Sequence, residues 1–276
     1  MKRITFILLL LATNFAMAQN LRIITYNIRL NIASDGINAW PNRADQVSAL
    51  LDFHQAEIFG LQEAMIEQIE DIHATLPKMK WVGVGRDDGA KAGEFSPVFY
   101  DAEKFKALKN GGFWLSETPE KPSLGWDAAY NRVCTWIVLK EIKTGDKFLV
   151  LNTHFDHIGL KAKTESAKLI LQKIKELNTD KLPVILMGDF NSTPETKAFA
   201  TITSELNDSH AITKKPPYGP VGTFNSFKWD APMKDRIDYV FVSDQIEVKR
   251  YGVLTDSKDQ RFPSDHQPVL VVLGLK

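Results

Sequence analysis

The chain has 276 residues, and its 34 basic side chains balance 34 acidic ones. This length suits one large globular domain or two small ones. The single cysteine, Cys134, excludes a disulfide within the chain, and the absence of a long basic stripe gives no support to tight binding of long nucleic acid.

The first 18 residues have the pattern of a signal peptide. Lys2 and Arg3 precede an apolar stretch at residues 4–12 that is short for a membrane span, and Ala16-Met17-Ala18 is a small-x-small cleavage signal. We therefore expect cleavage before Gln19, export, and no transmembrane segment after cleavage; an uncleaved anchor is the alternative. Removal of Lys2 and Arg3 leaves 32 basic against 34 acidic side chains, a charge near −2.

Strand-like runs rich in Val, Ile, Phe, Tyr and Trp recur along the chain. They cover residues 21–28, 58–61, 81–84, 97–100, 134–141, 148–153, 183–187, 237–242, 249–254 and 267–273. Apolar residues at helical spacing predict helices over 44–51, with Asn42 as the cap, over 67–76, over 167–177 and, shorter, over 198–203. Cys134 lies in a strand-like run and is predicted to be a small core residue rather than a nucleophile.

Strands outnumber helices, and helices separate only some of the strand pairs. This pattern favours two packed mixed sheets with helices on their outer faces over a regular βαβ repeat. Residues 85–96 and 214–235 are rich in Gly, Asp, Lys or Pro and predict long loops, which in a compact domain often carry function. We find no repeat or linker and predict a single domain over residues 19–276.

Polar side chains follow one buried strand in Met187-Gly188-Asp189-Phe190-Asn191. Gly188 allows the backbone to pass close to a neighbour. In extended backbone Asp189 and Asn191 point the same way, so they can hold a cation or an attacking water together. An Asx turn that only closes a loop is the alternative.

A second candidate pair is Asp238 with His266. Asp238 lies in a hydrophobic strand, where a carboxylate needs a partner. His266, in Ser264-Asp265-His266, is one candidate, because an Asp–His pair fixes the imidazole tautomer and favours the imidazolium. A local pair between Asp238 and Arg236 is the alternative. Asp265 is a candidate ligand.

Three further strand ends carry candidates. His154 follows residues 148–153 as an acid–base group, whereas Asp156 suits the start of the next helix equally well. Glu63 is either a metal ligand or a helix-capping acid, and Asn27 either orients a carboxylate or phosphate or closes a turn. Together these residues predict one site for a hard divalent cation and a phosphate ester at one edge of a sheet.

Taken in order, these residues resemble the endonuclease/exonuclease/phosphatase superfamily, which includes pancreatic deoxyribonuclease, abasic-site endonucleases, inositol polyphosphate 5-phosphatases, bacterial sphingomyelinases and deadenylases. The resemblance runs from Leu21 to Leu273 and depends on Gly-Asp-Phe-Asn, Arg-Ile-Asp-Tyr and Ser-Asp-His in this order. Gly85-Arg86-Asp87-Asp88-Gly89 and Phe113-Trp114-Leu115-Ser116-Glu117 look like the secreted bacterial branch. The matching positions are Asn27, Glu63, His154, Asp189, Asn191, Asp238, Asp265 and His266.

The resemblance implies a four-layered α/β sandwich, with two mixed sheets packed face to face and helices outside, and dependence on Mg²⁺ or Mn²⁺. It implies that Glu63 is the principal metal ligand, with Asn27 and Asp265 close by. Asp189 and Asn191 are expected to position water and phosphate. It further implies that Asp238 orients His266, and that His154 helps the leaving oxygen to depart.

The expected substrate-binding residues are Asn27, Arg29, Glu94 and Arg132. Glu94 is expected to partner His154, and Arg132 to contact phosphate. Abasic endonucleases carry Asp where this chain has Arg29, which speaks against abasic-site repair. Pancreatic deoxyribonuclease also reads Asn-Ile-Arg at this place, so Arg29 does not speak against activity. Side chains that could line the cleft, although packing in the core or a loop is favoured for each of them, are Trp40, Trp114, Trp126 and Trp229.

We thus expect an exported, monomeric, metal-dependent enzyme that hydrolyses a phosphodiester or phosphomonoester by in-line attack of water. Near-neutral charge favours a small or lipid-like ester over long DNA. One alternative is a secreted non-specific nuclease. The other is a non-catalytic protein that binds a phosphorylated glycan or lipid on the same fold.

Overall fold

The computed structural model describes residues 20–276, so the expected signal peptide lies outside the described residues. Within these residues, twelve strands form two six-stranded sheets. The first sheet contains β1 (Leu21–Asn27), β2 (Ile58–Gln62), β3 (Met79–Val82), β4 (Val98–Asp101), β11 (Ile246–Val253) and β12 (Val269–Leu275), in the order β11-β12-β1-β2-β4-β3. The second contains β5 (Phe105–Trp114), β6 (Val133–Glu141), β7 (Lys147–His154), β8 (Val184–Asp189), β9 (Asn207–Asp208) and β10 (Asp238–Val242), in the order β5-β6-β7-β8-β10-β9.

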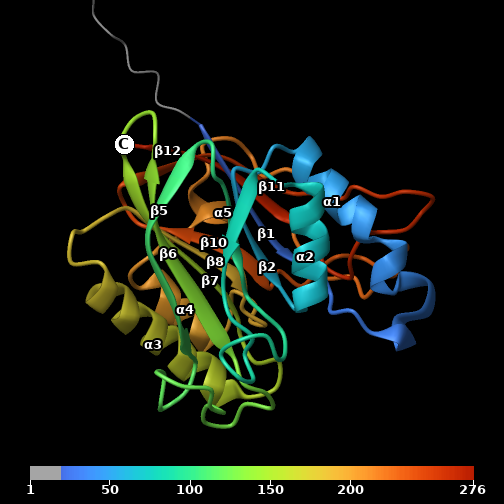
Figure 1. Ribbon diagram of the computed structural model, residues 1–276, viewed down its shortest axis with the longest axis horizontal. Helices are drawn as coiled ribbons and strands as arrows, with labels where there is room; N and C mark the ends of the chain where they lie inside the picture. The colour runs from blue at the N-terminus through green and yellow to red at the C-terminus, as the bar shows by residue number, and fades with distance from the viewer. Residues whose placement is uncertain (1–19) are drawn as a thin grey trace, which may run out of the picture.

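Helices cover the outer faces of both sheets (Figure 1). They are α1 (Ala44–Phe53), α2 (Ile66–Thr75), α3 (Leu160–Leu177), α4 (Lys197–Thr203) and α5 (Ser209–Ile212), with the 3₁₀ helices η1 (Ala33–Asn38) and η2 (Trp40–Asn42). In Figure 1, α1 and α2 lie on one flank and α3 and α4 on the other. Within residues 20–276 no helix is long and apolar enough to cross a bilayer.

Each sheet is mixed, as predicted. β1 runs parallel to β2 and β7 runs parallel to β8, whereas the other neighbouring strands are antiparallel. The carboxyl ends of a parallel pair meet at the same edge, which places the residues that follow β1 and β2, and those that follow β7 and β8, side by side.

Three apolar layers hold the sandwich together. Ile23 of β1 and Val240 of β10 belong to the layer between the sheets. Ile69 of α2 is buried against the first sheet, and Ile170 of α3 against the second. Cys134 is fully buried in the layer under α3, which confirms it as a core residue. Burial of each such aliphatic side chain stabilises the fold by about 2 kcal/mol.

One buried polar residue joins the two sheets. The side chain of Asn152 on β7 donates from Nδ2 to the carbonyl oxygens of Leu61 and Pro97, both at 2.8 Å, and its Oδ1 accepts from Nε2 of Gln62 at 2.7 Å. All three partners belong to the first sheet or its flank. Because Asn152 lies two residues before His154, this network fixes the two sheets relative to one another next to the polar edge.

The predicted strands and helices are all present, with shifted boundaries. The helix predicted from residue 167 begins at Leu160, and the strand predicted from residue 249 begins at Ile246. β5 was missed because its charged side chains and Gly111-Gly112 are untypical of a strand. The Asn42 cap was wrong: Asn42 lies in η2, and Arg43 occupies the N-cap of α1 without a side-chain cap.

Candidate active site

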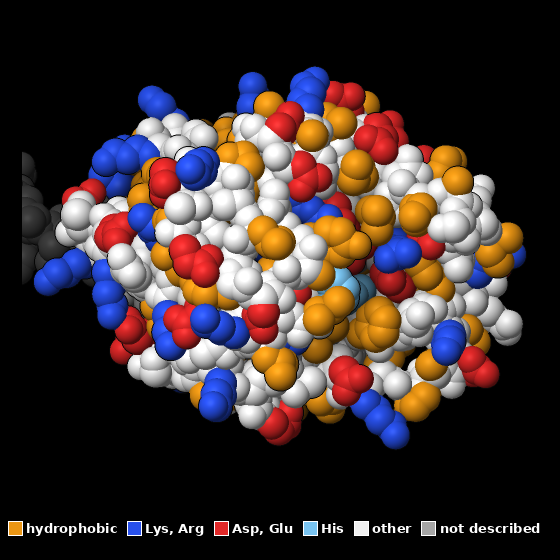
Figure 2. All heavy atoms as spheres, turned by 90° about the horizontal axis from the view of Figure 1, so that it is seen from below, with side chains coloured by type: hydrophobic (Ala, Val, Ile, Leu, Met, Phe, Trp, Pro, Cys, Tyr) orange, Lys and Arg blue, Asp and Glu red, His pale blue; other side chains and the backbone are white. Residues whose placement is uncertain are grey.

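The polar strand ends meet at one edge of the sandwich. Asn27 ends β1, Glu63 follows β2, His154 ends β7 and Asp189 ends β8. Asp238 begins β10 directly opposite Asp189, because β10 runs antiparallel to β8. Figure 2, which views the molecule from below Figure 1, shows imidazole atoms at the centre of this face with hydrophobic side chains around them.

Asp189 contacts three of the other polar residues of the cluster. Its Oδ2 accepts from Nδ2 of Asn27 at 2.9 Å and lies 3.6 Å from Nε2 of His154 and 3.8 Å from Nε2 of His266. Burial raises the pKa of the Asp189 carboxyl to about 7, and the charge of Asp238 acts in the same direction. A carboxyl with this pKa is suited to take up a proton near neutral pH.

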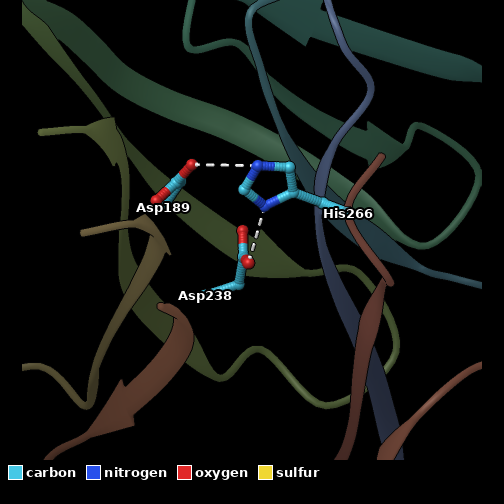
Figure 3. A group of neighbouring side chains, drawn as sticks. All are labelled: Asp189, Asp238 and His266. Atoms are coloured by element: carbon cyan, nitrogen blue, oxygen red, sulfur yellow. Dashed lines mark hydrogen bonds and ion pairs between the residues drawn. The ribbon is translucent and has the colours of Figure 1, made fainter. Parts of the chain in front are cut away.

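His266 lies between two carboxylates (Figure 3). Its Nδ1 is 2.9 Å from Oδ2 of Asp238, and its Nε2 faces Asp189. Burial by itself lowers the pKa of an imidazole, but the charges of Asp238 and Asp189 outweigh it and raise the pKa of His266 well above its ordinary value. The two carboxylates therefore favour the imidazolium form of His266.

The partner of Asp238 is thus His266 and not Arg236. Arg236 makes a buried bidentate pair with Asp208, with Nη1 and Nη2 at 3.0 and 2.8 Å from the two carboxylate oxygens. The Oδ2 of Asp238 also accepts from the hydroxyl of Thr223, and that hydroxyl accepts from the amide of Asp238. Thr223, which the sequence did not single out, orients the Asp238 carboxylate toward the imidazole.

His154 has the opposite charge state. Nδ2 of Asn191 donates to Nε2 of His154 at 3.0 Å, so the ring proton resides on Nδ1, which lies 3.8 Å from Oε2 of Glu94. Burial, followed by the positive charges of Arg132 and His266, lowers the pKa of His154 well below its ordinary value. The surroundings therefore favour the neutral form of His154 and the protonated form of His266.

Asn191 reaches this position through a turn and not through extended backbone. Its φ is 44°, and its amide donates to Oδ1 of Asp189 at 2.9 Å, which is the Asx turn that the sequence left as the alternative. Nδ2 of Asn191 also donates to the carbonyl of Phe155, while Nζ of Lys163 on α3 donates to the carbonyl of Asn191 at 3.1 Å. The turn thus closes the loop after β8 and also brings Asn191 into contact with His154.

Oxygen atoms gather on the other side of Asp189. Nδ2 of Asn27 donates to Oε1 of Glu63 at 3.1 Å as well as to Asp189, and Oε2 of Glu63 accepts from the amide of Leu30. Burial raises the pKa of the Asp265 carboxyl, which also experiences the negative charge of Glu63. Nη1 of Arg29 lies 3.7 Å from Glu63.

Arg29 has a different principal partner from the expected phosphate. Its Nε and Nη2 bind Asp35 in a bidentate pair at 2.9 and 3.1 Å. Arg29 itself has a φ of 57° and stands at the turn that follows Asn27. The side chain therefore links Asp35 to Glu63 at this turn, and its expected contact with substrate stays a prediction.

A second basic group adjoins His154. Glu94 pairs with Nη1 of Arg86 at 2.7 Å, and Nη1 of Arg132 lies 4.0 Å away. The guanidinium of Arg132 is buried, with Nη2 at 3.2 Å from Nδ1 of His157 and Nε in an ion pair at 3.5 Å from Oδ2 of Asp156. Within residues 20–276 its Nε and Nη1 make no hydrogen bond. An unmet buried donor of this kind is suited to an anionic oxygen.

Asp156 mainly holds the loop before α3, and its Oδ2 is also paired with Nε of Arg132 at 3.5 Å. Its two oxygens accept from the amides of Ala129, Tyr130, Ile158 and Gly159. This saturation agrees with the structural alternative for Asp156 at the start of α3.

Two groups of residues are arranged to hold a cation. Among residues 20–276, Asp189, Asp238 and His266 each offer an atom within 4.8 Å of the others, but the imidazolium of His266 already supplies the positive charge there. Glu63, Asn27 and Asp265 instead offer oxygen ligands, which Mg²⁺ and Mn²⁺ prefer. Two carboxylates share this side, and the nearby cation Arg29 is paired with Asp35. The oxygen cluster therefore fits a divalent cation better.

Two of the four tryptophans pack in the fold, as the sequence favoured. Trp40 is 2% exposed with its Nε1 bound to Asp71, and Trp114 is 6% exposed with its Nε1 bound to the carbonyl of Arg86. Both anchor loops and do not line a cleft. Trp126 is half-buried, and Trp229 is 46% exposed.

Comparison with known proteins identifies the family. The sequence profile of the endonuclease/exonuclease/phosphatase family matches residues 24–266. The chain belongs to this family. A family member from Bacteroides thetaiotaomicron has a TM-score of 0.89 and 41% identity, over 94% of this chain and 99% of that one.

Two further relatives differ in what they act on. A mannosyl-6-phosphatase from Bacteroides thetaiotaomicron VPI-5482 has a TM-score of 0.88 and 42% identity, over 92% of this chain and 99% of that one. The CCR4-Not complex 3′-5′-exoribonuclease subunit Ccr4 of Saccharomyces cerevisiae is 21% identical over 84% of this chain, which spans 35% of the length of that subunit. The predicted family and four-layered fold are thus confirmed, and the secreted bacterial branch stays a prediction.

Proposed function

We propose that this protein is a divalent-metal-dependent phosphoesterase that hydrolyses a phosphate ester by in-line attack of water. The observation that carries the proposal is the position of Asp189 between a protonated and a neutral imidazole, next to the oxygen cluster of Glu63 and Asn27. This arrangement supports a mechanism with a proton acceptor, a proton donor and a cation at neighbouring positions.

Asp189 and His266 carry the proton transfers in this proposal. Asp189 accepts a proton from the attacking water, since its pKa of about 7 allows it to be a base at neutral pH. His266 donates its proton to the leaving ester oxygen, and Asp238 stabilises its charge before transfer. The 3.8 Å between Oδ2 of Asp189 and Nε2 of His266 then allows the proton to return, so that the site is restored after one turnover.

Three other residues hold the phosphoryl group and the water. Asn191 orients the water through its amide oxygen, and the neutral His154 is positioned by Asn191 rather than acting as the stored acid. Nη1 of Arg132, which makes no hydrogen bond within residues 20–276, binds a phosphoryl oxygen. Glu63, Asn27 and Asp265 would hold a Mg²⁺ or Mn²⁺ ion, which would supply positive charge to the phosphoryl oxygens.

For the substrate we propose a phosphomonoester of a sugar, encountered outside the cytoplasm after export of the chain. The mannosyl-6-phosphatase supports this choice, because it covers nearly the whole chain at 42% identity. A nuclease is the second candidate, supported by the much lower identity to Ccr4. The balanced charge of the chain speaks against long nucleic acid.

The test is a substrate panel with matched variants. Purified protein with Mg²⁺ or Mn²⁺ is expected to hydrolyse mannose 6-phosphate and bis(p-nitrophenyl) phosphate at measurable rates, and EDTA is expected to stop both reactions. Asp189→Ala and His266→Ala should each lower kcat by about 10²-fold or more. Unchanged kcat in both variants would refute the mechanism, and preferred cleavage of RNA or plasmid DNA would favour the nuclease. Intact ligand after long incubation with metal would favour a binding protein.

A further inference from the structure

A cavity of about 260 Å³ lies beside the active site. Its walls come from η1, η2, the first turn of α1 and residues 258–262. We call it the Phe262 cavity. The lining side chains used in the argument are Asn38, Gln46, Lys258, Arg261 and Phe262.

The cavity is joined rigidly to the catalytic edge. Phe262 precedes Asp265 by three residues and His266 by four. Arg43, also in the wall, is buried and donates to the carbonyl oxygens of Ile28, Arg29 at 2.7 Å and Pro263 at 3.2 Å. One guanidinium thus connects the turn after Asn27 with the segment before Asp265, so the cavity has a fixed position relative to the phosphoryl site.

An exposed aromatic ring extends the cavity wall. Trp229, from the predicted loop 214–235, stacks on Phe262 with ring centres 4.9 Å apart and planes at 30°, while 46% of its surface remains exposed. In the same loop, the ring of Phe224 contacts the imidazole of His266 edge-on at 4.9 Å. Aromatic surface therefore lies both over His266 and beside the cavity.

The two loops that make this contact are strained. Ser226 and Phe227 have φ values of 56° and 60°, and Asp259 and Gln260 have φ values of 51° and 59°. The left-handed region is unfavourable for all four residues because none is glycine, and for the aromatic Phe227 most of all. Strain of this kind persists where the surroundings over-determine it and gathers at ligand clamps.

The polar lining has unused hydrogen-bonding capacity. Within residues 20–276 the side chains of Asn38, Gln46, Lys258 and Arg261 have neither a hydrogen bond nor an ion pair with the protein. Amides and cations of this kind bind hydroxyl groups, while an exposed indole packs on the apolar face of a pyranose ring. An aromatic ring together with free amides in one cavity is the combination that a sugar needs.

We propose that the Phe262 cavity, with Trp229 at its rim, is the subsite for the sugar ring of the substrate, and that Trp229 is a specificity-determining residue. The proposal rests on the proposed phosphoesterase activity and specifies which part of the molecule recognises the alcohol side of the ester. It predicts discrimination between a glycosyl phosphate and a phosphate ester without a ring.

The experiment compares mannose 6-phosphate with methyl phosphate. For the unaltered protein, kcat/KM is expected to be at least about tenfold higher for mannose 6-phosphate, and Trp229→Ala or Gln46→Ala should lower this ratio by about fivefold to tenfold, mainly through KM. Phe53→Ala, which removes a 79% exposed ring at the end of α1, is the matched control and should leave both values unchanged. Calorimetric titration of mannose 6-phosphate in EDTA gives a second measurement, in which Trp229→Ala should weaken binding by a similar factor.

The possible results separate the two proposals. If the protein hydrolyses neither ester nor bis(p-nitrophenyl) phosphate with metal, the phosphoesterase proposal fails. If it hydrolyses methyl phosphate and mannose 6-phosphate equally well, or if Trp229→Ala changes both alike, the sugar subsite is refuted while the activity stands. Preference for 5′-AMP over mannose 6-phosphate that disappears in Trp229→Ala would replace the sugar by a nucleoside and so overturn the proposal as well.

Discussion

At the scale of single residues, two histidines of the same site differ in charge. His266 has a carboxylate at each ring nitrogen, whereas His154 receives a hydrogen bond from Asn191 and lies near Arg132. The same burial therefore leads to opposite results, because the charges around each ring decide the direction of the shift. This difference supports His266, rather than His154, as the proton donor of the proposed mechanism.

Replacement of Asp238 tests this assignment. Asp238→Asn keeps the shape of the side chain but removes the charge that stabilises the imidazolium, so the pKa of His266 should fall and kcat should decrease by about 10²- to 10⁴-fold. The pKa can be followed by NMR of the imidazole protons in the folded variant. Asp230→Asn, an exposed substitution in the loop 214–235, is the control. A pKa of His266 that stays unchanged in Asp238→Asn would contradict the assignment.

His154 makes a prediction about stability and pH. Its pKa is depressed in the folded protein, so the unfolded chain binds its proton more tightly, and the contribution of His154 is fully present above the unfolded pKa of about 6.5. As the pH falls below that value the folded state loses stability, by at most about 1.4 kcal/mol per pH unit from this group.

The measurement is urea unfolding in EDTA between pH 5 and pH 7.5. His154→Gln retains an acceptor for Asn191 and removes the titration, so its free energy of unfolding should fall less steeply with decreasing pH than that of the unaltered protein. Parallel curves for the two proteins would show that His154 does not have the depressed pKa.

The sequence could predict those site residues that stand at strand ends, and it could not predict those defined only by their contacts in the fold. Strand ends with Asp, Asn, Glu or His are visible in the sequence, which is why Asp189, Asp238 and His266 were expected together. Thr223 and Arg43 were missed because their partners are a carboxylate and backbone carbonyls far away in the chain. No local pattern marks such residues, since only the folded arrangement gives them their contacts.

At the scale of elements, β7 and β8 are held close enough to exclude any side chain at one position. Gly188 precedes Asp189 with a φ of 152°, and a Cβ atom there would lie 2.1 Å from the carbonyl oxygen of Thr153 on β7. The close approach fixes the position of β8, the strand that carries Asp189.

Gly188→Ala should therefore reduce both stability and activity. The added methyl group forces β8 away from β7 or distorts the backbone at Asp189, with an expected loss of more than about 1 kcal/mol in the free energy of unfolding and of about tenfold or more in kcat. Gly112→Ala is the matched control. Gly112 lies on β5, which pairs with β6, and a Cβ atom there would be at an ordinary 3.5 Å from its nearest neighbour, the carbonyl oxygen of Cys134. Equal urea midpoints and rates for the two variants would contradict this account.

At the scale of the whole molecule, periodicity and composition predicted two mixed sheets with helices outside, because an alternation of strands and only some helices leaves few other ways to bury both faces of each sheet. The register between the sheets was beyond prediction. It depends on Asn152, whose hydrogen bonds to Leu61, Pro97 and Gln62 cross from one sheet to the other. In the sequence Asn152 is one polar residue in an apolar run.

The cation site joins these scales, because its expected ligands come from three segments that only the complete sandwich brings together. Asn27 ends β1, Glu63 follows β2, and Asp265 precedes β12. A cation bound there in the folded state alone stabilises the whole molecule, by about 2.7 kcal/mol when its concentration is 100 times the dissociation constant.

Thermal unfolding with increasing Mg²⁺ or Mn²⁺ should therefore give a rising Tm, whereas Glu63→Gln should show little increase. Glu70→Gln, an exposed substitution on α2, should behave as the unaltered protein does. If Glu63→Gln retains the full metal-dependent increase in Tm while Asp238→Asn loses it, the cation binds at the Asp189, Asp238 and His266 group instead, and the division of the site into a proton-transfer side and a metal side is wrong.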